Sequence, residues 1–199
     1  QESNPGYDLI QDFLNPATPT ELGFWEKFKF HISSVLLIAK HSKDTLKRAI
    51  LKGQYNHNQG VYFGGNDYQP EFFTLNTIWD KFTPTAKKVL LIDIHTGYGE
   101  RGRLHYLANA SNSEDAENLK SIFSKNKIDF GDDKEFYQVS GDITSFFQKK
   151  YSSPERKAYA LAFEFGTLDS QKILGSIDSL YRMIKENQGF HHQYKTQED

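Results

Sequence analysis

The sequence has no cysteine among its 199 residues. Disulfide bonds, thiolate ligands for a metal and a cysteine nucleophile are therefore excluded. The absence of cysteine does not separate the cytosol from the periplasm. The compartment stays open on this ground, and we slightly favour a soluble, cytoplasmic protein.

Long apolar runs and a strong net charge are also lacking. The longest apolar run, Ile32–Ala39, falls well short of the ~20 residues that a membrane span requires. A formal net charge of -2 and a pI near 6.4 provide no basic surface for DNA, RNA or an anionic membrane. We therefore expect neither nucleic acid nor a membrane among the partners.

The amino-terminal residues show no targeting pattern. They lack the basic and apolar regions of a signal peptide. The chain begins with Gln1 rather than Met, which is typical of a processed or truncated product.

Several catalytic motifs are missing as well. There is no Gly-x-Ser-x-Gly and no Walker phosphate loop, so a serine-triad hydrolase and a P-loop nucleotide site are weak hypotheses. No histidine begins a His-x-x-Glu pair. The nearest substitute, His41 with Asp44, would lie one turn apart on a helix and reach one ion. A solvated polar helix face explains that pair equally well.

The patterns that are present predict an α/β fold. Aromatic residues make up 15% of the chain, and its length suits one domain that buries about 70% of its unfolded surface. Strands alternating with helices favour a mixed, partly parallel sheet flanked by helices. We expect a single domain over residues 1–190 and a polar tail over 191–199. The periodicity predicts helices over 22–39, 41–51, 72–82 and 170–188 and strands over 87–94, 135–140 and 158–166.

Two other segments carry little periodicity. Residues 1–20 contain three prolines, which predicts an extended or turn-rich segment with at most one helical turn. Residues 54–67 mix Asn, Gly and aromatic residues, which predicts a loop built from turns. Such loops are often functional.

The strand over residues 87–94 is unbroken and apolar, which is typical of a strand buried on both faces. Alternation places Asp93 and His95 on one face at its carboxyl end. Ligands bind at the carboxyl ends of strands in α/β sheets, so His95 lies where a site is expected. A core histidine bonded to a backbone carbonyl is an equally good interpretation from spacing alone.

The strand over residues 158–166 repeats this pattern with Glu164. A lone Glu within an apolar strand is costly unless it is paired or used. Burial would raise its pKa toward neutrality, as a general acid or base requires, although a structural ion pair is about as good an explanation. Considered together, His95 and Glu164 favour a metal-bound water beside a carboxylate base.

Three further side chains are candidates for substrate contact. Arg101 and Arg103 follow the turn after His95 and would suit an anionic group. Tyr62 lies in the Gly-rich loop and would line a pocket wall. Surface roles remain open for all three.

Four segments, in order, resemble a known family: "GQYNHNQGVYFGG" at 53–65, "LLIDIHTGYGERG" at 90–102, "VSGDI" at 139–143 and "FEFGT" at 163–167. Together they are similar to the family catalogued as domain of unknown function 2817, which is related to the carboxypeptidase A and aspartoacylase superfamily. The resemblance implies a mixed sheet flanked by helices and one zinc ion. It implies that His95 is a zinc ligand and Glu164 the catalytic carboxylate. In a zinc site of this kind, Asp93 or a backbone group would orient His95.

The chain departs from that family in one respect. In such proteins a His-x-x-Glu pair and an Asn-Arg element lie upstream of the region matched here by residues 4–8. The resemblance therefore implies a carboxyl-terminal portion whose remaining zinc ligands lie upstream. An N-terminal segment or separate chain would complete the domain, and the isolated chain would be inactive.

Three functions follow as hypotheses. The leading one is a zinc-dependent hydrolase of amide or peptide bonds, carboxypeptidase- or deacylase-like, acting on a small-molecule or peptide substrate. The second is a catalytically inactive family member that acts as a binding or interaction module. The third is a metal-free hydrolase that uses Asp93 and Glu164 as a carboxylate pair. The substrate and the oligomeric state cannot be derived from the sequence.

Overall fold

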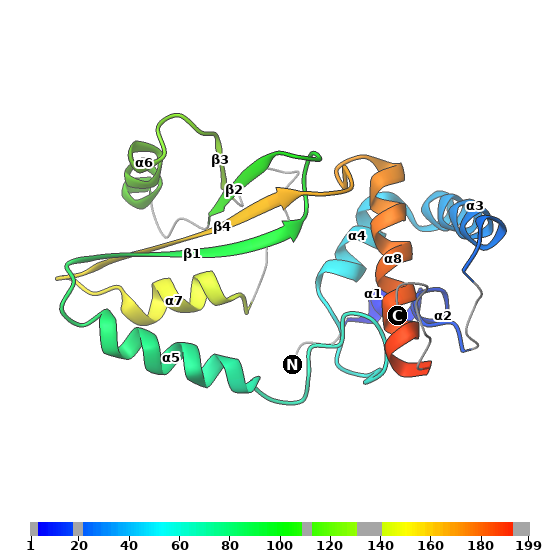
Figure 1. Cartoon of the computed structure of the whole chain (residues 1–199), viewed down its shortest axis with the longest axis horizontal. Coiled ribbons are helices and arrows are strands. Elements are labelled where there is room, and N and C mark those ends of the chain that lie inside the picture. Colours follow the sequence, from blue (N-terminus) through cyan, green and yellow to red (C-terminus); the bar gives the residue numbers. More distant parts are fainter. Residues whose placement is uncertain (1–3, 18–21, 109–112, 131–140, 193–199) are drawn as a thin grey trace. The chain divides into compact units, whose positions relative to one another are not determined.

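The computed structural model describes residues 4–17, 22–108, 113–130 and 141–192 (Figure 1). The chain divides into two compact units, each with its own core. The first unit comprises Gln1–Asp67 and Lys172–Asp199, and the second comprises Tyr68–Gln171. The single domain expected from the sequence stays a prediction.

The first unit is helical in its described part. Its helices are α1 (Pro5–Asp8), α2 (Gln11–Leu14), α3 (Phe24–His41), α4 (Lys43–Leu51) and α8 (Ile173–His192). None of the helices in the described part of the chain is long and apolar enough to cross a membrane.

The boundary between α3 and α4 lies at Ser42. Its backbone has a φ of 65°, and its hydroxyl accepts a hydrogen bond of 3.4 Å from the Thr45 amide, which caps α4. The two helices predicted over residues 22–39 and 41–51 are therefore confirmed. The placement of His41 and Asp44 one turn apart on a single helix is wrong, because the two residues lie on different helices.

The amino-terminal segment is more ordered than its prolines suggested. Tyr7, Ile10 and Leu14 are almost fully buried, since the two short helices α1 and α2 place all three toward the core. The prediction of at most one helical turn was wrong here, because an apolar spacing of three to four residues outweighs the prolines at its ends. The core also contains Leu46, Ala49, Val61 and Ile184.

At the other end of the chain, α8 continues through His191 and His192. The predicted tail therefore begins two residues too early. Residues 193–199 lie outside the described part.

The described part of the second unit contains a four-stranded sheet, which is mixed and flanked by helices as the sequence predicted. Its strands are β1 (Lys88–Gly97), β2 (Leu104–Ala108), β3 (Ile128–Phe130) and β4 (Lys157–Gly166), in the order β1-β4-β2-β3. Strand β4 is parallel to β1 and antiparallel to β2, and β2 is parallel to β3. Strands β2 and β3 were not predicted, because runs this short carry little periodicity. The strand predicted over residues 135–140 lies outside the described residues.

Helices cover both faces of this sheet. Helices α5 (Pro70–Phe82) and α7 (Ile143–Tyr151) lie on one face, and α6 (Ser113–Ile122) lies on the other (Figure 1). Aromatic rings fill the first layer, where Trp79 packs edge to face against Phe147 and Tyr151. The second layer has Leu119 of α6 at its centre, together with residues of β2, β3 and β4.

Strand β1 differs from its predicted environment. Val89 and Leu91 pack against the aromatic layer, but Leu90, Ile92 and Ile94 on the opposite face are 40%, 41% and 70% exposed. The prediction of burial on both faces is therefore wrong. The reason is position: β1 is the end strand of the described sheet, and the apolar cluster around α6 contains no residue of β1.

Candidate functional site

Three ionisable side chains form a row across three adjacent strands. The register pairs Glu164 of β4 with His95 of β1 on one side and with His105 of β2 on the other. Paired residues of neighbouring strands project to the same face of a sheet. Glu164 therefore lies between two histidines at the carboxyl end of β4.

Asp93 joins this row through His95. The Nε2 atom of His95 lies 2.8 Å from Asp93 Oδ2, which confirms that the two residues share a face. The Nδ1 atom of His95 lies 4.0 Å from Glu164 Oε1, which is longer than a hydrogen bond. When Nε2 donates its proton to Asp93, neutral His95 keeps the lone pair of Nδ1 for another partner on the side of Glu164.

The electrostatics of the site follow from these contacts. The hydrogen bond to Asp93 raises the pKa of His95, and partial burial opposes that shift. Burial raises the pKa of Glu164, while the nearby His95 and a hydrogen bond from the Tyr98 amide oppose the shift. The side chain of Glu164 is only 14% exposed and that of His95 is 48% exposed. Solvent therefore reaches the histidine while the carboxylate is sheltered.

The Gly-rich turn after β1 closes over this row. Gly99 has a φ of +108°, and a Cβ there would lie 2.3 Å from the ring of His105. The same ring accepts a hydrogen bond of 3.0 Å at Nε2 from the Glu100 amide. The His105 side chain thus supports the turn.

A second glycine lets this turn lie against the end of β4. A Cβ at Gly166 would lie 2.0 Å from the carbonyl oxygen of Glu100, a contact that no side chain permits. The backbone of Gly166 exchanges two hydrogen bonds of 2.9 Å, accepting from Gly102 and donating to Arg103. The Gly-rich segments "HTGYGERG" and "FEFGT" therefore lie in direct backbone contact.

Two residues that sequence reasoning missed hold the outer side of the turn. The Ser170 hydroxyl accepts a hydrogen bond of 3.1 Å from the Gly99 amide and lies 3.3 Å from the Gly97 carbonyl oxygen. Asp169 accepts one of 3.0 Å from the Arg101 amide. The signal was the Asp169-Ser170 pair, one residue after "FEFGT", because short polar side chains bond to the backbone of turns.

The predicted substrate contacts fall in two places. Arg101 and Arg103 are both exposed on the turn that follows His95, and Arg103 Nε lies 3.0 Å from Glu100 Oε2. Tyr62 belongs to the first unit, where it borders an open hollow of about 450 Å³. Its φ of 62° is unusual for a bulky residue, and burial raises its pKa to about 12.

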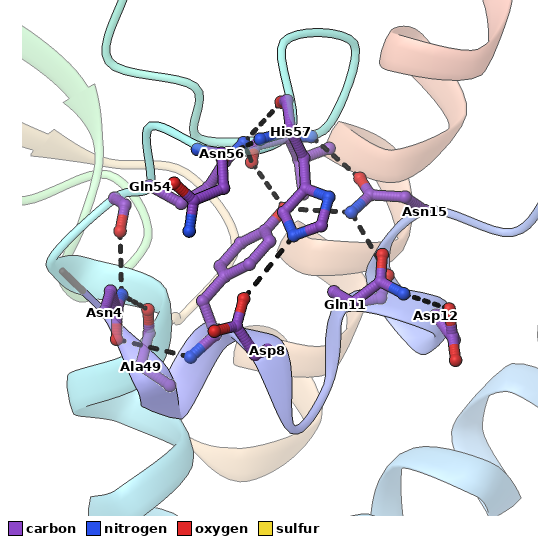
Figure 2. A network of polar contacts seen from close by, with 12 residues as sticks. Asn4, Asp8, Gln11, Asp12, Asn15, Ala49, Gln54, Asn56 and His57 are labelled. Atoms are coloured by element: carbon purple, nitrogen blue, oxygen red, sulfur yellow. Dashed lines mark hydrogen bonds and ion pairs between the residues drawn. The ribbon is translucent and has the colours of Figure 1, made fainter.

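The loop that contains Tyr62 is held by buried amide side chains (Figure 2). Asn4 donates hydrogen bonds of 2.7 Å to the carbonyl oxygens of Ala49 and Gly53. Gln54 accepts from the amides of Asn56 and His57 and donates to the His57 carbonyl oxygen. These side chains satisfy the backbone that a loop without helix or strand leaves unpaired.

Tyr7 and Asn15 complete this network from the other side. The Tyr7 hydroxyl donates a hydrogen bond of 2.7 Å to the Val61 carbonyl oxygen. The Val61 N–H donates one of 2.9 Å to Asn15 Oδ1. His57 lies at its edge, with Nε2 3.5 Å from Asp8 (Figure 2). The network is structural, because its amide groups bond mostly to the backbone of the loop.

The row at the end of β1 fits one coordination position of a zinc ion. A zinc-ligating histidine commonly donates its second ring nitrogen to a carboxylate, as His95 does to Asp93. Within the described part of the chain, no group of three or more His, Asp or Glu side chains is arranged to hold a metal. The residues present therefore offer one ligand, its orienting carboxylate and a neighbouring acid or base.

Comparisons with known proteins give one match. The model of a family described as "Protein of unknown function (DUF2817)" matches residues 1–198. No curated protein and no solved structure matches the chain.

Proposed function

The chain belongs to the DUF2817 family, and we propose that it is the carboxyl-terminal part of a zinc-dependent hydrolase of amide or peptide bonds, carboxypeptidase- or deacylase-like. The observation that supports this function best is the pairing of His95 with Asp93 beside the sheltered carboxylate of Glu164. The resemblance to the carboxypeptidase A and aspartoacylase superfamily belongs to the same proposal.

In this function His95 would hold the metal, and the contact of Nε2 with Asp93 leaves Nδ1 as the ligand atom. Asp93 accepts the Nε2 proton, which orients the ring and makes Nδ1 a better donor of electrons. When bound, zinc lowers the pKa of a water molecule and polarises the substrate carbonyl. The remaining ligands come from an N-terminal segment or a separate chain, and the isolated chain is inactive.

Glu164 moves the proton. Its carboxylate accepts a proton from the attacking water and passes it to the leaving amine. Burial raises the pKa of Glu164, and a base whose pKa lies closer to neutrality transfers a proton in both directions more readily. The Tyr98 amide bonds to the same carboxylate and limits its rotation.

The exposed arginines complete the proposal. Arg101 and Arg103 lie on the turn beside the row and offer cationic groups to an anionic part of a small-molecule or peptide substrate. Tyr62 belongs to the first unit, and its role in substrate binding stays a prediction.

The test uses the full-length gene product. Glu164→Gln keeps the size of the side chain but removes the proton acceptor, so hydrolysis should fall by about 10²–10⁴-fold. Zinc content, measured by elemental analysis, should stay the same. The control is His95→Gln, which should lower both zinc content and activity.

Two results would favour the other hypotheses. A wild-type protein that carries no zinc and hydrolyses nothing would point to a binding module. Hydrolysis that survives a chelator would instead favour the carboxylate pair of Asp93 and Glu164. Full activity of Glu164→Gln would exclude the proposed role of that residue.

A further inference from the structure

The protonation state of His105 follows from a single contact. Its Nε2 atom accepts a hydrogen bond of 3.0 Å from the Glu100 amide. A backbone N–H group donates and never accepts, so Nε2 must present a lone pair. A neutral imidazole carries its proton on the other nitrogen. While this bond is made, His105 is therefore neutral and its proton is on Nδ1.

The two histidines beside Glu164 therefore differ in their tautomer. The Nε2 atom of His95 lies 2.8 Å from a carboxylate oxygen of Asp93, which only accepts, so this Nε2 carries a proton. The Nε2 atom of His105 carries none. Glu164 lies between the two rings in the register of the sheet. One ring is thus bonded to a side chain of its own strand, and the other is bonded to the backbone of the turn.

Two amides of the turn connect His105 to Glu164. The Glu100 amide donates to the His105 ring, and the Tyr98 amide donates to the Glu164 carboxylate. Gly99 lies between them and passes directly beside the ring, where a Cβ would overlap the Cδ2 and Nε2 atoms of His105. Because only one residue separates Tyr98 from Glu100, a shift of Glu100 away from the ring also displaces the Tyr98 amide.

We propose that neutral His105 is a positioning residue for Glu164. It accepts from Glu100 and so holds the turn in the place where the Tyr98 amide reaches the Glu164 carboxylate. The part of Glu164 in proton transfer rests on the proposed function, whereas the two hydrogen bonds do not. A second proton on His105 converts Nε2 from an acceptor to a donor, and two N–H groups then face each other. Acid therefore releases the turn, and with it the amide that orients Glu164.

Charged and titratable groups lie around His105 on three elements. Glu164 faces it from β4 and favours a charged ring, whereas the Glu100 amide favours a neutral one. The carboxylate of Glu100 is bound by Arg103 over 3.0 Å. Further groups on these elements are Tyr98 of the turn, with its ring centroid 6.4 Å from that of His105, and the ion pair of Lys127 with Asp129 at β3.

Two amide side chains test the contact with Glu100. His105→Gln places an oxygen about as far from the backbone as Nε2, and this oxygen accepts a hydrogen bond at every pH. His105→Asn carries the same group on a side chain that is one methylene shorter, so its oxygen does not reach the Glu100 amide. Glutamine should therefore keep the turn in place. Asparagine is the matched control and should release it.

The tautomer is measured on the full-length gene product, labelled with ¹⁵N at histidine. NMR reads the ring nitrogens at about pH 8 and about pH 5, the range in which histidine ordinarily changes its charge. We expect a neutral His105 ring with its proton on Nδ1 at the higher pH and a doubly protonated ring at the lower. The spectrum of His105→Gln assigns the signals, because it lacks those of this ring.

Hydrogen exchange measures the release of the turn. After correction for the intrinsic pH dependence of exchange, the Tyr98 and Glu100 amides of the wild type should exchange at least about fivefold faster at the lower pH. His105→Gln should show the same protection at both values. His105→Asn should show the faster exchange at both.

Activity supplies a readout that a purely structural contact would not change in this way. In the assay used for Glu164→Gln, kcat/KM of His105→Gln should fall less steeply from about pH 8 to pH 5 than that of the wild type. The decline that remains belongs to Glu164 and to the zinc site. His105→Asn should lose about tenfold in kcat/KM at the higher pH with unchanged zinc content.

Three results would overturn the proposal. The first is a His105 ring with its proton on Nε2 at the higher pH. The second is a turn whose protection stays the same while the ring takes up its second proton. The third is equal exchange in His105→Gln and His105→Asn. A protein that hydrolyses nothing would refute the proposed function instead, and the ring spectrum and the exchange would still decide whether His105 holds the turn.

Discussion

Both units contain histidines beside aspartates, and the surroundings of His57 in the first unit differ from those of His95 in the second. In the first unit His57 lies 3.5 Å from Asp8, at the edge of a network in which amide side chains bond to backbone. In the second unit His95 lies 2.8 Å from Asp93, and its other ring nitrogen faces the sheltered carboxylate of Glu164. A histidine next to a carboxylate is therefore not a sufficient sign of chemistry. What distinguishes His95 is a nitrogen directed at a second ionisable group.

The two regions also close in different ways. The loop of the first unit is closed by side chains such as Asn4 and Gln54, which substitute for missing backbone partners. The turn over the row in the second unit lies close to the His105 ring and to the end of β4, which is possible because Gly99 and Gly166 have no Cβ. Loss of a side-chain amide should therefore destabilise the loop of the first unit. Addition of a Cβ at a glycine should destabilise the turn of the second unit.

The largest effect on stability should follow from Gly166→Ala. A Cβ there would lie 2.0 Å from the Glu100 carbonyl oxygen, so the turn must move away from β4. We expect a loss of about 2–4 kcal/mol in the free energy of unfolding, measured by urea denaturation. Gly189→Ala is the control, because nothing lies within 4 Å of its Cβ and it is in α8, where alanine favours the helix by roughly 0.5–1 kcal/mol. Equal stabilities of the two variants would contradict the packing described for the turn.

A smaller loss should follow from Gln54→Ala in the first unit. The substitution leaves the amides of Asn56 and His57 without their acceptor, at a site where Gln54 is 3% exposed. Leaving buried groups unsatisfied costs about 1–3 kcal/mol. His57→Ala is the matched change at the edge of the same network and should cost less than about 1 kcal/mol. If His57→Ala proves the more harmful, then the network is not held by its amides.

The smallest effect should be a change in pH dependence at Asp93→Asn. The hydrogen bond to Asp93 raises the pKa of His95 above its ordinary value of 6.5, and NMR titration of the ring should show this value fall in the variant. A histidine whose pKa is higher in the folded state contributes stability below its unfolded pKa and loses it as the pH rises through the folded value. Asp93→Asn should therefore be more destabilised near pH 6 than near pH 9. A His95 pKa that does not move would refute the pairing.

The prediction of the site from the sequence succeeded where local rules were sufficient. Residues two apart on a strand share a face, and this rule alone placed Asp93 beside His95. Burial of Glu164 also followed from its apolar neighbours in β4, and the structure agrees. The roles of these residues in binding zinc and in catalysis stay predictions.

Other features could not be predicted because they depend on which strands become neighbours. Nothing local sets the register that brings Glu164 between His95 and His105. Ser170 and Asp169 carry no periodic pattern, and their contacts with the turn arise only when β4 lies beside β1. The uncovered face of β1 was mistaken for a buried one for the same reason, since an apolar run does not reveal how many neighbours a strand has.

The sequence by itself determined the α/β class, the helices α3, α4, α5 and α8, the DUF2817 membership and the polar end of β1, because these rest on periodicity and on motifs read along the chain. The tertiary structure alone decided the strand order, the place of β1 at its end and the contact of the two Gly-rich segments. The physical reason is that pairing between distant segments is set by the summed packing of whole elements. No short stretch of residues contains that information.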